Sequence, residues 1–203
     1  MKKRVLGIDC SSSTIGIGVC EYDKKNLKYI ACEYIKPIKS DDIAFRLADT
    51  RDKLLEVFDK YKPDEIVIEE IISYMPGKSS ANTIIVLATF NRMASLLAYD
   101  YLGKSPKHYS VMDIRRGIMM NNIVPDKEDI PDLTAKILKI KFPWELNKNK
   151  KRIVENNDKA DALAVCLFEC YIGIGKSNVP LTIVEKKAKK KIIRAKRKAR
   201  IKK

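Results

Sequence analysis

The sequence predicts an α/β fold: a five-stranded mixed sheet, made of an antiparallel meander plus parallel strands and flanked by helices. Two observations lead to this prediction. Three apolar runs near the N-terminus follow one another with only short polar turns between them, as in a meander. Further along, short apolar runs alternate with segments whose apolar residues recur at helical spacing, which predicts parallel strands joined by helical crossovers.

The meander occupies the first 35 residues. Strands are predicted at Val5–Ile8, Ile15–Glu21 and Leu27–Ile35, because each run is rich in apolar and β-branched residues. The turns between them, 11–14 and 23–26, consist of Ser, Thr, Asp, Asn and Lys. Short turns of this kind favour antiparallel pairing of neighbouring strands.

A helix, a strand and a longer helix are predicted next. The first helix follows Ser40 and Asp41, which are candidate N-caps. Pro63 marks the entry to a strand at Glu65–Glu69, which a crossover from the meander would place parallel to its neighbour. The helix at Ala81–Leu102 is more apolar than one buried stripe requires, so part of it is expected to face a partner chain.

The C-terminal third is predicted to complete the sheet and cover it. A short strand at His108–Val111 is followed by helices at Asp113–Met120 and Pro131–Phe142. A final helix is expected to be capped by Asn157 and to end near Gly173.

The formal charge of +15 is concentrated near the C-terminus. Residues Val184–Lys203 carry twelve Lys and Arg and one Glu, a net +11, while the other residues carry 29 bases and 25 acids, a net +4. Such a segment cannot bury enough apolar surface to fold by itself, and it would release counterions on meeting a polyanion. We therefore predict a domain over residues 1–175 and a basic arm over 176–203 that binds nucleic acid; a solvated tail that aids solubility is the alternative.

The composition also indicates where the protein is found and which kinds of site it lacks. No apolar stretch is expected to reach the roughly 20 residues of a membrane span, and the N-terminus leads directly into a strand, so we expect a soluble, cytoplasmic protein with no membrane partner. The five cysteines lack metal-ligand spacing and are expected to be reduced and structural. With His108 as the one histidine, a Ser-His-Asp triad is disfavoured.

Four carboxylates fall where predicted strands end or a helix begins. Asp9 follows the first strand and Glu69 closes the fourth, and a buried strand that ends on an acid needs a compensating cation or donor. Asp158 and Asp161 are three residues apart at a helix start, so they share one face with about 5–6 Å between their Cβ atoms. The competing explanation is that the helix dipole favours acids at this end without any further role.

Carboxylates without nearby Cys or His ligands favour Mg²⁺, or Mn²⁺ in its place, over zinc. Two such ions, about 3.5–4 Å apart, hydrolyse phosphodiesters without a protein nucleophile. Asp9, at the sheet centre, is expected to bridge both ions. Glu69 would hold the ion that orients water, and Asp158 with Asp161 the ion beside the leaving group.

Three acidic motifs resemble those of the RuvC-type Holliday junction resolvases, a family of the RNase H-like superfamily. They are Gly7-Ile8-Asp9 with Ser12, Gly16 and Gly18 behind it, then Val67-Ile68-Glu69-Glu70, then the segment 157–164, NDKADALA, which is the most specific. The resemblance covers residues 4–172. It implies an RNase H-like fold, a homodimer and magnesium-dependent paired nicks in a four-way DNA junction, with the catalytic acids at Asp9, Glu69, Asp158 and Asp161.

The resemblance also suggests DNA contacts. Arg115 falls about where the family has a basic residue near the scissile phosphate, and Tyr74 could replace the family's stacking aromatic, whose position holds Ile72 here. The basic loop around Lys148–Arg152 and the C-terminal arm are more typical of phage members, and a phage-encoded enzyme would act in the bacterial host's cytoplasm. The candidate DNA-binding residues are Tyr74, Lys78, Arg115, Lys150, Lys151 and Arg152.

Several alternatives stay open at this point. Glu70 could enter the site in place of Glu69, since only one of two adjacent strand residues faces it. The chain could be a related nuclease acting on RNA, or a junction-binding protein whose acids are structural. The region Asp9–Gly18 also resembles the first phosphate loop of sugar-kinase and actin-like nucleotide binders, although 203 residues are too few for their two lobes.

Overall fold

The computed structural model describes residues 1–24, 26–71, 80–119 and 124–176. Within them, five strands form one sheet in the order β3-β2-β1-β4-β5. The first three pair antiparallel, whereas β1 with β4 and β4 with β5 are parallel, which confirms the predicted mixed sheet. The elements are β1 (Lys3–Cys10), β2 (Ile15–Tyr22), β3 (Leu27–Ile35), α1 (Ile43–Tyr61), β4 (Glu65–Glu69), α2 (Ala81–Leu102), β5 (Lys107–Tyr109), α3 (Val111–Met119), the 3₁₀ turn η1 (Lys127–Asp129), α4 (Ile130–Leu138) and α5 (Glu155–Gly173).

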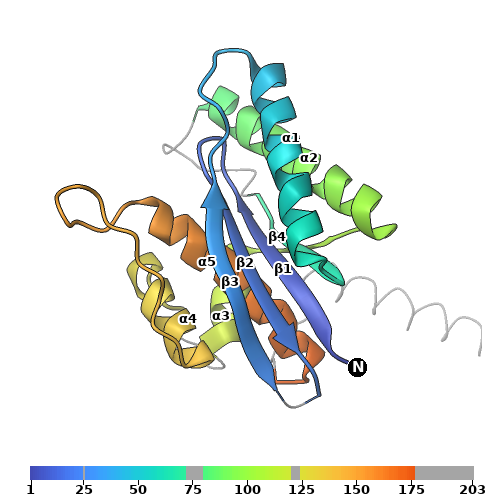
Figure 1. The fold of residues 1–203 in the computed structure, drawn as a ribbon, viewed down its shortest axis with the longest axis vertical. Coiled ribbons are helices and arrows are strands. Elements are labelled where there is room, and N and C mark those ends of the chain that lie inside the picture. The colour runs from blue at the N-terminus through green and yellow to red at the C-terminus, as the bar shows by residue number, and fades with distance from the viewer. Residues whose placement is uncertain (25, 72–79, 120–123, 177–203) are drawn as a thin grey trace, which may run out of the picture.

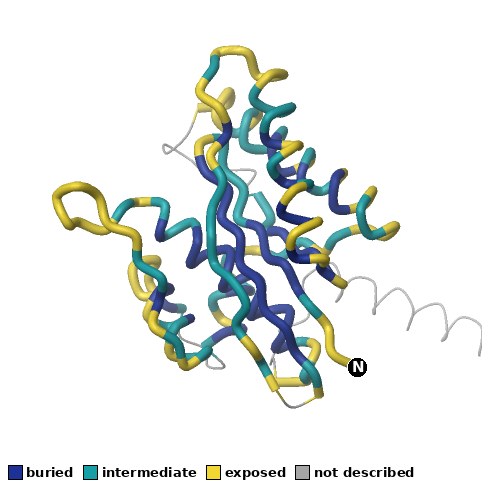
Figure 2. The backbone as a smooth tube through the Cα atoms, viewed as in Figure 1, coloured by how far each residue is buried: buried dark blue, intermediate teal, exposed yellow. Residues whose placement is uncertain are grey.

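Helices cover both faces of the sheet, with α1 and α2 on one face and α3, α4 and α5 on the other (Figure 1). Successive strand residues point to opposite faces. Accordingly, Leu6 and Ile8 of β1 join the core under α1 and α2, while Val5 joins the core under α5. The same alternation assigns Asp9 to the α5 face. Figure 2 shows that the central strands and α5 form the most deeply buried part of the chain.

Glycines let α5 lie directly on the sheet. A Cβ atom at Gly16 would stand 2.0 Å from the carbonyl oxygen of Asp158, and one at Gly7 would stand 2.4 Å from that of Ala162. Any side chain at these positions would push the helix outward. Because Asp158 and Asp161 belong to α5, these glycines determine how closely the two acids approach β1.

The ends of four helices differ from the prediction, and α3 begins at Val111, the residue at which the strand before it was predicted to end. Asp42, and neither Ser40 nor Asp41, caps α1: its Oδ1 accepts the backbone N–H of Ala44 at 2.8 Å, and Ser40 Oγ instead accepts the N–H of Asp42. Helix α4 ends at Leu138, short of the predicted Phe142, because the next residue is left-handed. The prediction of Asn157 as a cap was wrong, since α5 already begins at Glu155.

Helix α2 corrects the expectation about apolar stretches. Among the described residues it is the one helix whose length and hydropathy would suffice to cross a membrane. In the fold, however, it lies against the sheet and α1 through Phe90, Ala94 and Leu97. Asn91 on the same side donates its side-chain amide to the Glu69 carbonyl at 2.8 Å. We therefore interpret α2 as a core helix with a second apolar face.

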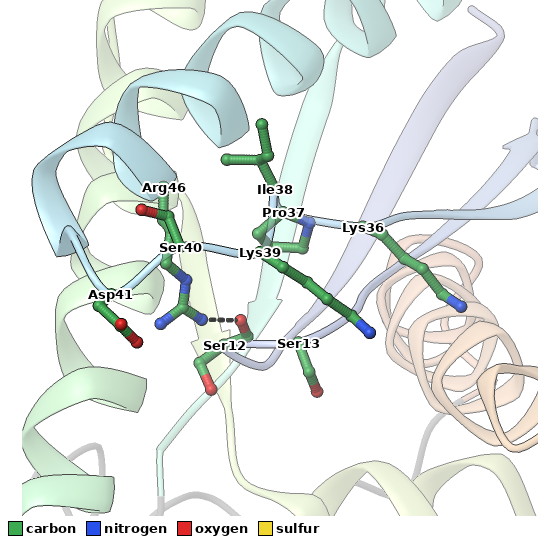
Figure 3. A pocket seen from close by; sticks show the side chains of 9 residues that line it. All are labelled: Ser12, Ser13, Lys36, Pro37, Ile38, Lys39, Ser40, Asp41 and Arg46. Carbon is green, nitrogen blue, oxygen red and sulfur yellow. Dashed lines mark hydrogen bonds between the residues drawn. The ribbon is translucent and has the colours of Figure 1, made fainter.

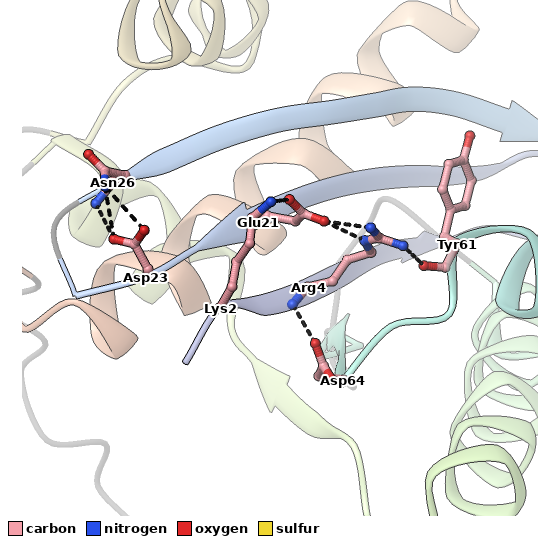
Figure 4. A network of polar contacts seen from close by, with 7 residues as sticks. All are labelled: Lys2, Arg4, Glu21, Asp23, Asn26, Tyr61 and Asp64. Carbon is pink, nitrogen blue, oxygen red and sulfur yellow. Dashed lines mark hydrogen bonds and ion pairs between the residues drawn. The ribbon is translucent and has the colours of Figure 1, made fainter.

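The end of the sheet opposite Asp9 is held by a polar network (Figure 4). Arg4 on β1 donates to the Glu21 carboxylate of β2 and to the Tyr61 carbonyl at the end of α1. Ion pairs and hydrogen bonds from Lys2 and Arg4 lower the pKa of Glu21. These contacts join β1, β2 and α1 far from the four acids. The start of β1 therefore stabilises the fold, while its end carries Asp9.

Candidate active site

The four predicted acids converge at one end of the sheet, on its α5 face. Burial, followed by the negative charges of Glu69, Asp161 and Asp158, raises the pKa of Asp9 well above its ordinary value. Burial and Asp161 likewise raise the pKa of Glu69 to about 7, and burial is the main cause that raises the pKa of Asp158 to about 6. The pKa of Asp161 is also raised, chiefly by burial. Four carboxylates that resist ionisation together form a strong site for positive charge.

The four acids offer the oxygen ligands that divalent metal ions prefer, but their side chains are not positioned to bind an ion together. Oxygen ligands from Asp and Glu are those that Mg²⁺ and Mn²⁺ prefer. Within the described part of the chain, however, no three Asp, Glu, His or Cys side chains lie so that they could hold an ion as they stand. The carboxylates lie close enough to raise one another's pKa, yet they would have to come closer together to share one ion.

A lysine that the sequence analysis missed supplies positive charge at this site. Lys127, in η1, places Nζ 3.2 Å from Asp161 Oδ2. Burial acts to lower the pKa of Lys127, but Asp161, Asp9 and Asp158 outweigh it and raise that pKa. No sequence pattern marked this residue, because it is a lysine in a connecting segment of a chain with 41 Lys and Arg.

Arg115 lies on the same side, as the resemblance suggested. It is part of α3, and its charge acts to lower the pKa of both Glu69 and Asp161, against the larger effect of burial. Its Nε is buried and has no hydrogen-bond partner among the described residues. A buried donor without a partner costs free energy unless a ligand completes it.

The alternation of β4 separates Glu69 from Glu70. Val67 packs in the core under α5, so Glu69, two residues later, points to the same face as Asp9. Glu70 points to the other face, where its Oε1 accepts from Arg92 Nη2 of α2 at 2.7 Å. The structure thus places Glu69, and not Glu70, among the acids.

Of the other predicted DNA-binding residues, the structure describes three. Lys150, Lys151 and Arg152 are exposed on the loop before α5, where the Arg152 guanidinium stacks 3.6 Å from the Trp144 ring centroid. Tyr74 and Lys78 fall outside the described residues.

The one histidine does not form a nucleophile triad. His108 Nε2 lies 3.0 Å from Ser95 Oγ, but that hydroxyl donates to the Asn91 carbonyl of its own helix, so the ring nitrogen must be the donor. His108 Nδ1 is 3.7 Å from Glu70 Oε2, beyond hydrogen-bond distance. A base in this tautomer cannot take a proton from Ser95.

Glu69→Gln is expected to stabilise the metal-free protein above pH 7. The folded-state pKa of Glu69 is raised from 4.5 to about 7, so the stability linked to this group is present below pH 4.5 and is lost as the pH rises through 7. The shift corresponds to about 3 kcal/mol for full burial, and we expect about 1–2 kcal/mol because solvent reaches Glu69. Urea unfolding in EDTA at pH 5 and pH 8 measures the difference.

The control for this prediction is Glu56→Gln, which changes an exposed side chain of α1. Its stability relative to the unaltered protein should not depend on pH. If Glu69→Gln behaves in the same way, Glu69 does not share a site with the other acids.

Sheet order, helices on both faces and converging acids define an RNase H-like domain. The chain belongs to the family of crossover junction endodeoxyribonuclease RuvC, whose family model matches residues 5–169. The family predicted from the motifs is thereby confirmed; the phage origin stays a prediction.

Relatives and solved structures agree with this assignment. The RuvC of Fusobacterium nucleatum subsp. nucleatum is 28% identical, with coverage of 81% of this chain and 78% of the relative. That of Caldanaerobacter subterraneus subsp. tengcongensis is 27% identical, over 83% and 92%. Among solved structures, T. thermophilus RuvC in complex with Holliday junction substrate shares the fold, with a TM-score of 0.64, 20% identity and coverage of 86% of this chain and 98% of that one.

Proposed function

We propose that this protein is an endonuclease that resolves four-way DNA junctions by paired, magnesium-dependent nicks. The observation that carries the proposal is the meeting of four acids, one buried and three half-buried, from β1, β4 and α5, in a chain of the RuvC family. The family match favours this function over an RNA nuclease, a nucleotide binder or a catalytically silent junction-binding protein. The activity would take place in the cytoplasm, that of a bacterial host if the chain is phage-encoded.

The four acids would bind the metal ions, and the fold determines where they lie. Asp9, Glu69, Asp158 and Asp161 would hold two Mg²⁺ ions, with Mn²⁺ as a substitute. When bound, the ions supply an activated water and stabilise the leaving 3′ oxygen. The protein's own part is to present the carboxylates from a sheet and a helix in direct contact, because the glycines of β1 and β2 let α5 pack against the strands.

Lys127 and Arg115 bring the substrate to these acids. Four carboxylates would repel a phosphodiester, and two cations on the same side offset that repulsion. The guanidinium of Arg115, whose Nε has no hydrogen-bond partner in the described part of the chain, would pair with a phosphate oxygen.

Cleavage of synthetic four-way junctions tests the proposal. Radiolabelled or fluorescent junctions, linear duplex and single-stranded RNA are incubated with the protein in Mg²⁺ and in EDTA. Symmetric nicks in the junction, present in Mg²⁺ and absent in EDTA, are expected. Faster cutting of RNA would indicate the RNA nuclease, and junction binding without any cutting would indicate a silent binding protein.

A homodimer is proposed through the exposed face of α2. Ile85, Leu96 and Tyr99 are 62%, 60% and 50% exposed, and their spacing puts them on one side of the helix. Leu96→Glu is expected to convert the dimer to a monomer, because it would bury a charge in an apolar interface. Light scattering after size-exclusion chromatography gives the mass. Val154→Glu, at a 70% exposed position near the start of α5, is the matched control and should leave the mass unchanged.

The basic C-terminal arm, residues 176–203, is proposed to strengthen DNA binding together with Lys150, Lys151 and Arg152. Deleting Val184–Lys203 removes a net charge of +11 and should weaken junction binding and flatten its salt dependence. Each lost phosphate contact lowers the slope of log K against log salt by roughly 0.9. Anisotropy titrations at several KCl concentrations measure it.

An arm of equal length with Gln at every Lys and Arg is the control for this deletion. It should behave like the truncated protein. An unchanged slope in either variant would show that the arm does not touch DNA.

A further inference from the structure

A basic pocket lies at the turn that follows Asp9 and β1, and none of the four acids lines it. Its volume is about 500 Å³, and its walls are the turn between β1 and β2 and the segment between β3 and α1 (Figure 3). The lining side chains that can meet a ligand are three bases, three hydroxyls and one acid: Lys36, Lys39, Arg46, Ser12, Ser13, Ser40 and Asp41. A surplus of two positive charges with hydroxyl donors around it suits an anion with several oxygen atoms.

The three bases of the pocket differ in the contacts that they already make within the protein. Lys36 pairs with Glu155 at the start of α5, and Arg46 donates Nη2 to the Ser12 carbonyl and stacks over the Phe90 ring. Lys39 is exposed and has no ion pair among the described residues. Figure 3 shows the Lys39 ammonium above Ser13, with Arg46 between it and Asp41, so the one acid lies at the far end of the pocket.

The turn between β1 and β2 connects this pocket to the acids. Ser11 holds the turn together, since its Oγ accepts the N–H of Thr14 at 2.9 Å and donates to the Thr14 carbonyl at 2.6 Å. The Thr14 side chain lies close enough to Asp158 to act to lower the pKa of that carboxyl. Ser12 is three residues from Asp9, so the chain cannot separate them by more than about 10 Å. Measured along the axis of a duplex, that distance corresponds to the rise of about three nucleotides of one strand.

We propose that this pocket binds a backbone phosphate of the DNA strand that is cut, within about three nucleotides of the scissile phosphate. The inference rests on the proposed function and adds to it a second point at which the strand is held. The Lys39 ammonium would pair with the phosphate. Arg46 holds the turn that contains Ser12 in place. A strand held at this second point as well as at the acids cannot slide past them, so the pocket determines which phosphate meets the acids.

Uncharged phosphates test the proposal. A series of four-way junctions is prepared, each with one methylphosphonate at a phosphate near the cut, and dissociation constants are measured by anisotropy in Ca²⁺, with cleavage rates in Mg²⁺. For the unaltered protein, one position other than the scissile phosphate should weaken binding about threefold to tenfold. Lys39→Gln should bind the normal junction more weakly by a similar factor and lose its sensitivity at that position. Lys39→Arg should restore both.

Lys28→Gln is the matched control, because Lys28 is an exposed lysine at the other end of β3. It removes the same charge and should keep the full sensitivity to the methylphosphonate. If Lys39→Gln keeps that sensitivity at every position, the pocket does not hold DNA and the proposal is overturned, while junction cleavage by the unaltered protein still upholds the proposed function.

Inorganic phosphate distinguishes a DNA site from a site for a free anion. If phosphate raises the melting temperature of the unaltered protein more than that of Lys39→Gln while the methylphosphonate series has no effect, the pocket serves a free anion and the proposal fails. If the unaltered protein neither binds nor cuts junctions, the proposed function fails and the DNA role of the pocket fails with it.

Discussion

Asp161→Asn is expected to lower the junction cleavage rate by about 100-fold or more and to change the dissociation constant for junctions by less than about twofold. Asp161 lies on α5 among three other acids, and it would be one of the ligands that hold the catalytic ions. Loss of one electrostatic contact to a reacting group costs about 10²–10³ in rate. Binding should survive, because affinity for DNA comes mainly from Lys and Arg on phosphates.

The substitution is also expected to leave the fold intact. Asn has the same shape as Asp, and its side-chain oxygen can still accept from Lys127, whose Nζ is 3.2 Å from Asp161 Oδ2. Removing one charge from a group of neighbouring carboxylates relieves repulsion, so the melting temperature in EDTA should not fall.

Single-turnover cleavage and anisotropy on the same junction preparation measure the two effects. Asp59→Asn, at an exposed position of α1, is the matched control and should cut at the normal rate. If Asp161→Asn loses binding together with cleavage, the acid has a structural role, and if it cuts normally, the acids are not the catalytic centre.

Much of the site was predictable because it depends on the two-residue period of strands. In β1 and β4, apolar residues alternate between the two cores, and that alternation carries Asp9 and Glu69 to the same face. It also turns Glu70 toward α2, a point that the sequence left open because adjacent acids at a strand end cannot be ranked without knowing which face is covered.

Lys127 could not be predicted, because no strand or helix period relates it to the acids. It belongs to a 3₁₀ turn in a connecting segment, so no periodicity relates it to the acids, and only the packing of α3, α4 and α5 brings η1 to them. The start of α5 escaped prediction in a similar way. Asn156, at the second position of the helix, donates its side chain to the carbonyls of Glu145 and Ile153, so contacts with the preceding loop rather than an N-cap side chain fix where the helix begins.

Gly16→Ala is expected to lower junction cleavage by about 100-fold and stability by about 1–3 kcal/mol. The added methyl group would stand 2.0 Å from the carbonyl oxygen of Asp158, which is backbone and cannot rotate away. Helix α5 must therefore move off the sheet, and it carries Asp158 and Asp161 away from Asp9. A misplacement of about 1 Å at a reacting centre is enough to cost about 10² in rate. Cleavage per folded molecule and urea unfolding measure the two effects.

Gly175→Ala separates loss of stability from displacement of the acids. Gly175 has a left-handed backbone with φ of 69°, and nothing lies within 4 Å of its missing Cβ. Alanine there should cost about 1 kcal/mol of stability through the backbone alone and should leave cleavage per folded molecule unchanged. If the two variants lose activity in proportion to stability, α5 does not position the acids; if only Gly16→Ala loses cleavage, the close contact of α5 with β2 is what brings the carboxylates of the helix to that of β1.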